Sequence, residues 1–200
     1  SKGRGQSLDF VLSTLQRQAA SCLNGLSPFI EDMLSQRLGA EELSEADVDI
    51  DQFDTSPLAV FVDEIRGIAR SAALLEDDPK LDRLLAYVAE KKQLANNKLL
   101  VFSTFRHTLS YLADHLVQTG VRVGLVHGGV PDDERRELRA RFAKDQSDPD
   151  AIDLLLSSEV GTEGLDYQFC DALVNYDLPW NPMRIEQRIG RIDRRGQSSE

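Results

Sequence analysis

After Asp78 the sequence alternates between short apolar runs and longer amphipathic segments, and this alternation limits the possible folds more than any other feature. The apolar runs are short enough for buried strands, and the segments between them repeat apolar residues every three or four positions, as helices do. The expected strands are 98–103, 121–127, 152–157 and 172–176, and the expected helices are 80–94, 107–118, 132–143 and 182–194. This order predicts an α/β fold with a parallel sheet covered by helices on both faces.

The first 78 residues predict a separate helical appendage. Apolar residues at helical spacing run through 8–38, with an expected interruption at Ser27-Pro28. Residues 39–55 are acidic and carry few large apolar side chains, which is typical of an exposed linker. Ser56-Pro57 then begins a further helix that continues to Ala72. We therefore divide the chain into an appendage, 1–78, and an α/β domain, 79–200.

The net charge of −11 is distributed unevenly, and the distribution decides which partners are plausible. Residues 1–78 hold 6 basic and 15 acidic residues, whereas residues 79–200 hold 17 and 19. Five arginines are concentrated in residues 184–195. A local basic stripe permits contacts with phosphates because distant charges are screened. The overall acidity argues against broad, nonspecific coating of DNA by this chain alone.

Several common classes of protein are disfavoured by the sequence. Cys22 and Cys170 do not have metal-ligand spacing, so we expect no metal site and two buried thiols in a reducing compartment. No apolar run approaches the roughly 20 residues of a membrane span, and no signal-peptide pattern is present. The chain starts Ser-Lys-Gly-Arg-Gly, without Met, so we expect a fragment of a longer protein.

The sequence also lacks Gly-x-x-x-x-Gly-Lys-Ser/Thr, the loop that holds the phosphates of ATP in many motors. The segment 58–64 ends in Asp63-Glu64, as a magnesium-binding strand would. Its apolar residues continue at helical spacing to Ala72 and a Pro helix signal precedes it, so we interpret it as a helix. Any nucleotide phosphates must therefore be held mainly by another part of the protein.

Ligands of open parallel sheets bind at the carboxyl ends of the strands. Four polar or glycine-rich stretches follow the expected strands: 103–107, 127–131, 157–166 and 177–182. The following helix carries the arginines, and at helical spacing Gln187, Arg191 and Arg194 share a face. Two interpretations of this face remain open, a solvated charged surface and a phosphate site suited to planar guanidinium groups.

The arginine stripe overlaps a second one, and both depend on the helix continuing to about residue 194. The second stripe consists of Arg184, Arg188, Arg191 and Arg195. Arginines this close repel one another, so we expect the stripe to bind an anion. The isoleucines at 185, 189 and 192 are predicted to form the opposite, buried side.

The stretch Gln187-Arg-Ile-Gly-Arg-Ile-Asp-Arg-Arg-Gly-Gln197 resembles motif six of superfamily-two helicases, and its final Gly-Gln pair resembles the Swi/Snf branch. The resemblance implies that Arg191 and Arg194 are catalytic arginines that reach the triphosphate of ATP across a cleft, with Gln187 beside the nucleotide. The stretch 157–166, Ser-Ser-Glu-Val-Gly-Thr-Glu-Gly-Leu-Asp, resembles motif five. By this likeness Ser158 contacts the nucleic-acid backbone, Gly164 lies near the ATP-binding interface and Asp166 faces the ribose, although many Swi/Snf enzymes have Asn there.

Three further stretches resemble the same family in the same order. Residues 99–105 resemble motif four, residues 127–128 a His-Gly segment, and residues 177–182 the Trp-Asn-Pro turn of Swi/Snf enzymes. The nucleic-acid contacts implied by these three are Ser103, Thr104, Arg106, His127, Gly128 and Trp180. Taken singly, each has another explanation: a core or capping role for His127, packing for Trp180, and solvent-exposed turns for Thr104 and Arg106.

The matches cover residues 80–197 and resemble most closely the bacterial Swi/Snf-like ATPases that associate with RNA polymerase. The resemblance implies a RecA-like lobe, truncated before a further strand, that forms the second half of an ATP-dependent DNA translocase. ATP and Mg2+ would be held mainly by the N-terminal RecA-like lobe of the same polypeptide, in a bacterial, nucleoid-associated cytoplasmic protein. Expected partners are duplex DNA or another nucleic acid, and RNA polymerase or another protein complex.

Two alternatives remain for the activity. The chain could belong to a helicase that separates RNA or DNA strands, or it could be a degenerate lobe that serves as a protein-binding module. The Trp-Asn-Pro and Gly-Gln features favour a duplex translocase, and the intact arginines disfavour a degenerate lobe. In either motor, this chain alone is expected to lack ATPase activity.

Overall fold

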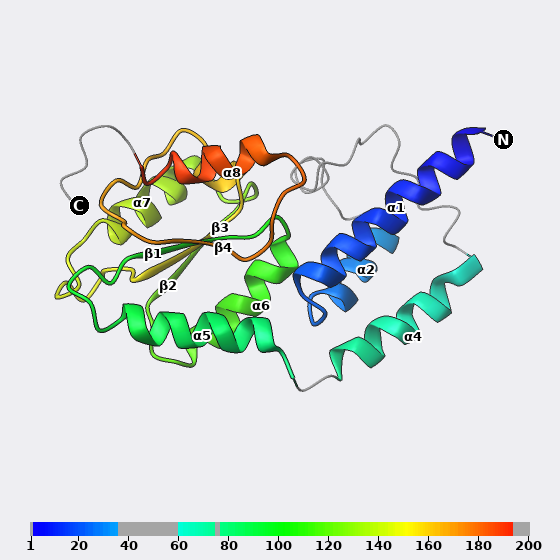
Figure 1. Ribbon diagram of the computed structural model, residues 1–200, viewed down its shortest axis with the longest axis horizontal. Helices are drawn as coiled ribbons and strands as arrows, with labels where there is room; N and C mark the ends of the chain where they lie inside the picture. Colours follow the sequence, from blue (N-terminus) through cyan, green and yellow to red (C-terminus); the bar gives the residue numbers. More distant parts are fainter. Residues whose placement is uncertain (1, 36–59, 75–76, 194–200) are drawn as a thin grey trace. The chain divides into compact units, whose positions relative to one another are not determined.

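The computed structural model describes residues 2–35, 60–74 and 77–193 of the 200-residue chain (Figure 1). The chain divides into two compact units, Ser1–Asp77 and Asp78–Glu200. The expected acidic linker, 39–55, lies outside the described residues. In the described part of the chain, no helix is both long enough and apolar enough to cross a bilayer.

The first unit contains α1 (Lys2–Ser21), α2 (Leu26–Leu34) and α4 (Val62–Ala73). The helix α2 packs against both of the others and buries Phe29, Ile30 and Met33. The chain leaves its first helix at residues 22–25, earlier than the expected break at Ser27-Pro28. Pro28 instead lies in the first turn of α2, where the absence of an N–H donor costs no helical hydrogen bond.

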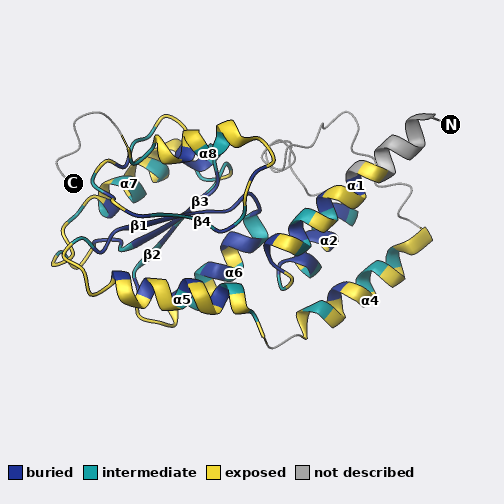
Figure 2. Cartoon of the chain, in the orientation of Figure 1, coloured by how far each residue is buried: buried dark blue, intermediate teal, exposed yellow. Residues whose placement is uncertain are grey.

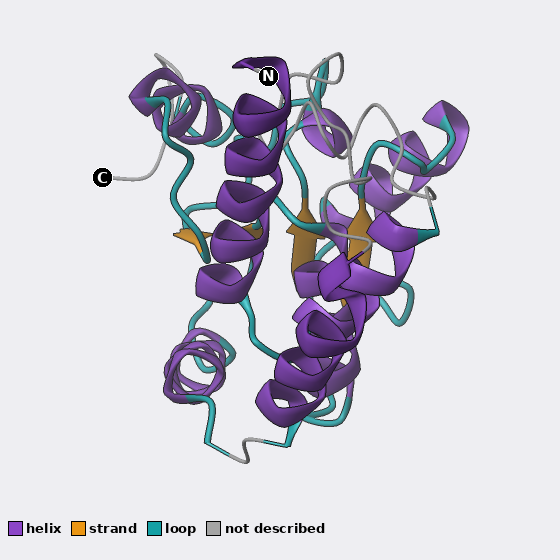
Figure 3. Ribbon diagram, turned by 90° about the vertical axis from the view of Figure 1, so that its right-hand side faces the viewer, coloured by secondary structure: helices purple, strands orange, loops and turns teal. Residues whose placement is uncertain are grey.

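The second unit is built on a parallel sheet, as the sequence predicts. Its strands are β1 (Leu99–Phe102), β2 (Val123–Val126), β3 (Leu154–Ser157) and β4 (Leu173–Asn175), in the order β2-β3-β1-β4. All three pairings are parallel, with β1 and β3 aligned from Leu99 and Leu154 onward. The strands are short, and helices supply most of the regular structure (Figure 3).

Helices cover both faces of this sheet. Figure 1 shows α5 (Pro79–Lys91) and α6 (Arg106–Val117) on one face, and α7 (Asp132–Phe142) and α8 (Pro182–Ile189) on the other. Alternate residues of β1 belong to two separate apolar cores, with Leu99 and Val101 in one and Leu100 and Phe102 in the other. The central strands β1 and β3 are accordingly buried throughout, β4 is half-buried, and the outer sides of the helices are exposed (Figure 2). This architecture confirms the α/β, RecA-like expectation.

The last helix is shorter than expected, and the difference moves a predicted site residue. We expected a helix over 182–194, but α8 ends at Ile189. After Gly190 the chain forms turns, in which Ile189 O accepts from both Ile192 N at 3.0 Å and Asp193 N at 2.9 Å. Glycine is a poor helix former, so the helix stops readily at this position. Arg191 therefore lies just beyond the helix, and the prediction that the helix continues through it is wrong.

Candidate functional site

The four strand-end loops meet at one edge of the sheet because all four strands run in the same direction. This edge carries the loop after β1 (103–105), the loop after β2 (127–131), the loop after β3 that contains the short turn η3 (Val160–Thr162), and the loop after β4 (176–181). The stretches singled out from the sequence therefore lie at a common edge.

Asp177 holds the loop after β1 in place. Its carboxylate accepts hydrogen bonds from Ser103 Oγ at 2.5 Å and from both the backbone N and Oγ1 of Thr104 at 2.9 Å. Both Ser103 and Thr104 are buried. Their predicted contacts with nucleic acid would therefore require this network to open. Arg106, two residues after Thr104, is the half-buried first residue of α6.

The buried side of α8 is formed by an arginine. Arg188 is only 1% exposed, and its guanidinium bonds to Glu159, to Asn175 Oδ1 at 2.9 Å and to Asp177 O at 3.0 Å. Arg184 pairs with the same Glu159 at 2.9 Å.

The expectation that Arg184 and Arg188 belong to an anion-seeking stripe is therefore wrong, because carboxylates of the fold itself pair with them: Glu159 with both, and Asp177 with Arg188. Of the three isoleucines expected on the buried side, Ile189 is 43% exposed, whereas half-buried Ile192 packs against one of the apolar cores. The carboxylate partner, Glu159, is 29 residues from Arg188 in the sequence, so helical spacing could not identify it.

The loop after β3 needs its two glycines for different reasons. A Cβ on Gly161 would lie 2.6 Å from the carbonyl oxygen of Val126, so only glycine fits this close approach to β2. Gly164 has a φ of 75°, a left-handed conformation that favours glycine. The close approach at Gly161 is thus to the protein's own backbone. Ser158 is also buried, and its Oγ accepts from Gly161 N at 3.3 Å.

Arg191 is joined to the far end of the same loop. Its Nη1 donates to Leu165 O at 3.2 Å, and Tyr167 N donates to Arg191 O at 2.8 Å. The guanidinium is half-buried, and among the described residues it forms no ion pair. Asp166 pairs with Arg139 of α7 at 2.8 Å and remains partly exposed. Arg191 thus keeps N–H donors available.

The remaining residues expected around the nucleotide differ in what the structure says of them. Gln187 is exposed on the outer side of α8. Arg194, together with Arg195, lies outside the described residues. The roles of Gln187, Gly164 and Asp166 toward a nucleotide stay predictions.

Tyr167 and Cys170 follow the loop after β3 and are buried and uncharged near neutral pH. Burial raises the pKa of the Tyr167 hydroxyl to about 12 and that of the Cys170 thiol to about 11. The Tyr167 ring packs 5.9 Å from the ring of Phe142 in α7. Both Cys170 and Cys22 are free and buried, as the sequence predicts. Neither titratable group is suited to proton transfer near neutral pH.

His127 and Trp180 occupy contrasting positions at the same edge. The Nδ1 atom of half-buried His127 accepts a hydrogen bond from Gly129 N at 3.1 Å, which closes a local turn around Gly128. Trp180 is 78% exposed beside exposed Leu178 and Met183, so it does not serve as core packing. A nucleic-acid contact by His127 stays a prediction, whereas Trp180 offers an open ring face.

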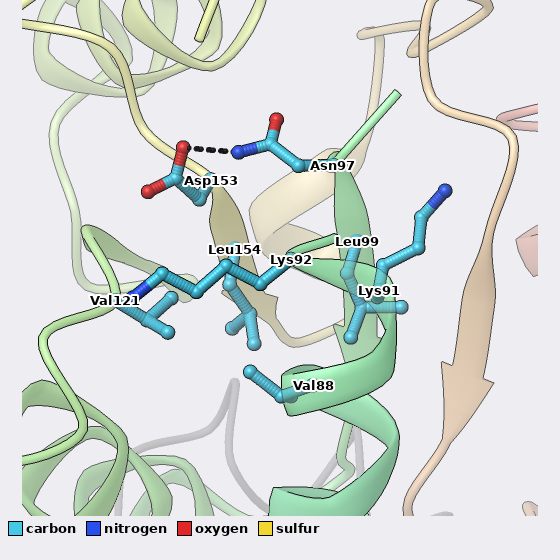
Figure 4. A pocket seen from close by; sticks show the side chains of 8 residues that line it. All are labelled: Val88, Lys91, Lys92, Asn97, Leu99, Val121, Asp153 and Leu154. Carbon is cyan, nitrogen blue, oxygen red and sulfur yellow. Dashed lines mark hydrogen bonds between the residues drawn. The ribbon is translucent and has the colours of Figure 1, made fainter. Parts of the chain in front are cut away.

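Two hollows of the second unit have none of the arginines of 184–191 in their lining. One of about 10 Å³ lies at the amino ends of the strands, where Asn97 Nδ2 donates to Asp153 at 2.7 Å (Figure 4). Another of about 390 Å³ lies between α5 and β4, lined by Lys80, Tyr87 and Tyr176 among others. Among residues 2–35, 60–74 and 77–193, no group of His, Cys, Asp and Glu side chains is arranged to hold a metal ion.

Comparison with known proteins identifies the α/β unit. The family described as "Helicase conserved C-terminal domain" matches residues 79–196. The chain is 30% identical over 191 residues to the uncharacterized ATP-dependent helicase YqhH of Bacillus subtilis, covering 96% of this chain and 30% of that protein. It is 40% identical over 124 residues to the RNA polymerase-associated protein RapA of Yersinia enterocolitica, covering 62% of this chain and 12% of RapA.

A solved structure agrees with these sequence relatives. The DEAD-box protein SrmB of Escherichia coli, crystallised with the regulator of ribonuclease activity A, matches with a TM-score of 0.50 and 26% identity. The match covers 60% of this chain and 67% of the SrmB chain. The present chain spans less than a third of the length of either sequence relative. The family match over more than half of the chain shows that it belongs to the helicase conserved C-terminal domain family.

Proposed function

We propose that this chain is the second motor lobe of an ATP-dependent translocase that moves along duplex DNA. The observation that carries the proposal is the environment of Arg191 directly after α8, where its half-buried guanidinium donates to Leu165 O and forms no ion pair among the described residues. A guanidinium with donors to spare suits the oxygens of a phosphate. In a two-lobed motor, Arg191 and Arg194 would stabilise charge that develops on the transferred phosphate.

ATP and Mg2+ are proposed to be held mainly by the N-terminal lobe of the same polypeptide. When bound there, ATP supplies the phosphoryl group whose hydrolysis drives the motor. The residues of this chain fit a supporting role, because Arg191 and exposed Gln187 offer hydrogen-bond donors. Gly164 and Asp166 would complete this side of the cleft, with the Asp166 carboxylate held by Arg139 near the ribose.

Nucleic acid is proposed to bind along the loops at the carboxyl edge of the sheet. Exposed Trp180 can stack on a base or sugar, and Arg106 can contact a phosphate. In the other loops, the residues proposed to contact the nucleic acid through their backbone or turns are Ser103, Thr104, His127, Gly128 and Ser158. RNA polymerase or another protein complex is a proposed partner, because RapA is named as RNA polymerase-associated. A cytoplasmic, nucleoid-associated location follows from such partners.

The test uses the full-length polypeptide and compares Arg191→Ala with Arg136→Ala. We expect Arg191→Ala to lower the kcat for DNA-stimulated ATP hydrolysis by about 10³-fold, in the range seen when an arginine finger is removed. Arg136 is exposed on α7 and serves as the matched control. Residues 1–200 alone should show no ATP hydrolysis. Hydrolysis by this chain alone that Arg191→Ala abolishes would contradict the proposed division between lobes.

A strand-separating helicase is the second candidate, and the structural similarity to a DEAD-box protein favours considering it. A duplex translocase should displace a bound obstacle, such as a third DNA strand, without separating the duplex beneath it. A strand-separating helicase should release one strand of a labelled duplex. Unwinding of a short RNA or DNA duplex by the full-length protein would select this second candidate.

A further inference from the structure

One buried arginine links the three loops that lie at the nucleic-acid side of the candidate site. The Arg188 guanidinium reaches Glu159 in the loop after β3 at 2.8 Å, Asn175 at the end of β4 at 2.9 Å, and the Asp177 carbonyl in the loop after β4 at 3.0 Å. The carboxylate of Asp177 in turn holds Ser103 in the loop after β1 at 2.5 Å. The arrangement joins segments that are far apart in sequence.

This cluster balances its charges internally. Glu159 and Asp177 provide two carboxylates, and Arg184 and Arg188 provide two guanidinium groups. A charge with 1% exposure is tolerated only when it is paired and its donors are satisfied. A planar guanidinium can bridge several acceptors in different directions, whereas an ammonium group is a compact point charge. Lysine at position 188 would keep the charge and lose this geometry.

The same arginine is directly connected to the residue proposed to meet the nucleotide. Arg191 N donates to Arg188 O at 3.1 Å, so the two residues share one turn of backbone. The guanidinium of Arg191 contacts Leu165 O, six residues after Glu159 in the loop after β3. The two arginines therefore hold one loop at both of its ends. A shift of Arg191 must be accompanied by a shift of Arg188 or by a distortion of this turn.

We propose that Arg188 is a positioning residue that couples the nucleotide side of the lobe to its nucleic-acid side. It fastens α8 to the loops after β1, β3 and β4, so that these segments move as one body when Arg191 responds to the nucleotide. Coupling between two sites can be carried by a chain of packed side chains and hydrogen bonds such as this one. The inference rests on the proposed motor function, because its test measures ATP hydrolysis stimulated by DNA. It assigns a role to Arg188, a residue that is proposed to contact neither the nucleotide nor the nucleic acid.

The test compares Arg188→Lys with Arg184→Lys in the full-length protein. Arg184 pairs with the same Glu159 from the first turn of α8 and is the matched control. The measured quantity is the ratio of kcat with DNA to kcat without DNA. We expect Arg188→Lys to lower this ratio at least tenfold, because small misplacements in an active site can reduce rates on the order of 100-fold. Arg184→Lys should change the ratio less than about threefold.

A purely structural role for Arg188 makes a different prediction. Loss of folded protein lowers both rates together and leaves their ratio unchanged, so an unchanged ratio overturns the inference. If Arg188→Lys fails to fold, Glu159→Gln replaces it, because glutamine preserves shape and one acceptor while removing the charge. That variant should also lower the ratio, and a ratio equal to that of the unaltered protein again overturns the proposal.

A second measurement separates failure of the inference from failure of the proposed function. Hydrogen exchange of the full-length protein reports the opening of individual segments. Arg188→Lys should speed exchange together in residues 103–105, 158–166 and 177–181, whereas Arg184→Lys should not. If the unaltered protein shows no DNA-stimulated hydrolysis, the motor function fails and the exchange experiment alone decides. Faster exchange confined to α8 then overturns the coupling.

Discussion

At the scale of single residues, Gly161 sets how closely the loop after β3 approaches β2. A Cβ at this position would lie 2.6 Å from Val126 O, which belongs to the backbone and cannot rotate away. We expect Gly161→Ala to lower the free energy of unfolding by about 1–3 kcal/mol, as overpacking does. Urea unfolding at equilibrium measures this change. Gly164→Asn is the control, because asparagine tolerates a left-handed φ, and an equal loss in both variants would contradict the steric explanation.

The same scale shows where prediction from the sequence stops. Helical spacing correctly indicates that Arg184 and Arg188 are neighbours, but it does not say whether they point outward or inward. The deciding partner, Glu159, comes from a loop between two other elements, and only the three-dimensional arrangement brings it within 2.8 Å of Arg188. A glutamate directly after a buried strand end was the available signal. Asp177, which follows β4 in the same way, gave a similar signal.

At the scale of elements, Asp153 holds the amino ends of three strands together. It lies just before β3, accepts from Asn97 near β1 at 2.7 Å, and pairs with Arg122 before β2 at 2.5 Å. Burial alone would raise its pKa, but the hydrogen bonds from Arg122 and Asn97 hold the pKa below its usual value of 3.8. The folded state therefore favours the charged carboxylate.

From this shift follows a pH dependence with a definite sign. The stability contributed by Asp153 is present above its unfolded pKa and is lost as the pH falls through its lower folded pKa, below 3.8. We expect Asp153→Asn to lower the free energy of unfolding at pH 7 by about 1–3 kcal/mol. The difference from the unaltered protein should shrink on acidification below pH 3.8. Urea unfolding at pH 7, 5 and 3 tests this expectation, with exposed Asp150→Asn as the control that should change little.

The elements themselves were largely predictable, and their ends were not. Apolar periodicity indicated every described α-helix and strand of the second unit, because burial against a sheet imposes a regular pattern. The end of α8 depends on Gly190 and on the turn that Arg191 forms with Leu165, neither of which alters the apolar pattern. The break before α2 was likewise misplaced, because Pro28 is as compatible with a first turn as with an interruption.

At the scale of the whole molecule, the division after Asp77 predicts independent unfolding of two units. Met33 is buried in the first unit and Leu112 in the second. Replacing either by Ala removes buried methylene groups at a cost of about 2–5 kcal/mol. We expect calorimetry of residues 1–200 to show two transitions, with Met33→Ala lowering one melting temperature and Leu112→Ala the other. A single transition that both variants lower would contradict the division.

Among the described residues β4 is an edge strand of the sheet, and this has a consequence for the behaviour of this chain in concentrated solution. Tyr176 N donates to Phe102 O and Leu100 N donates to Ala172 O, so the even-numbered residues turn their amide groups toward β1. Leu173 and Asn175 turn theirs outward, since a strand alternates. The unpaired backbone groups of an edge strand can pair with a strand of another chain and start aggregation. Lys80 and Arg83 line the hollow between α5 and β4. Their like charges discourage the β4 edges of two copies from pairing.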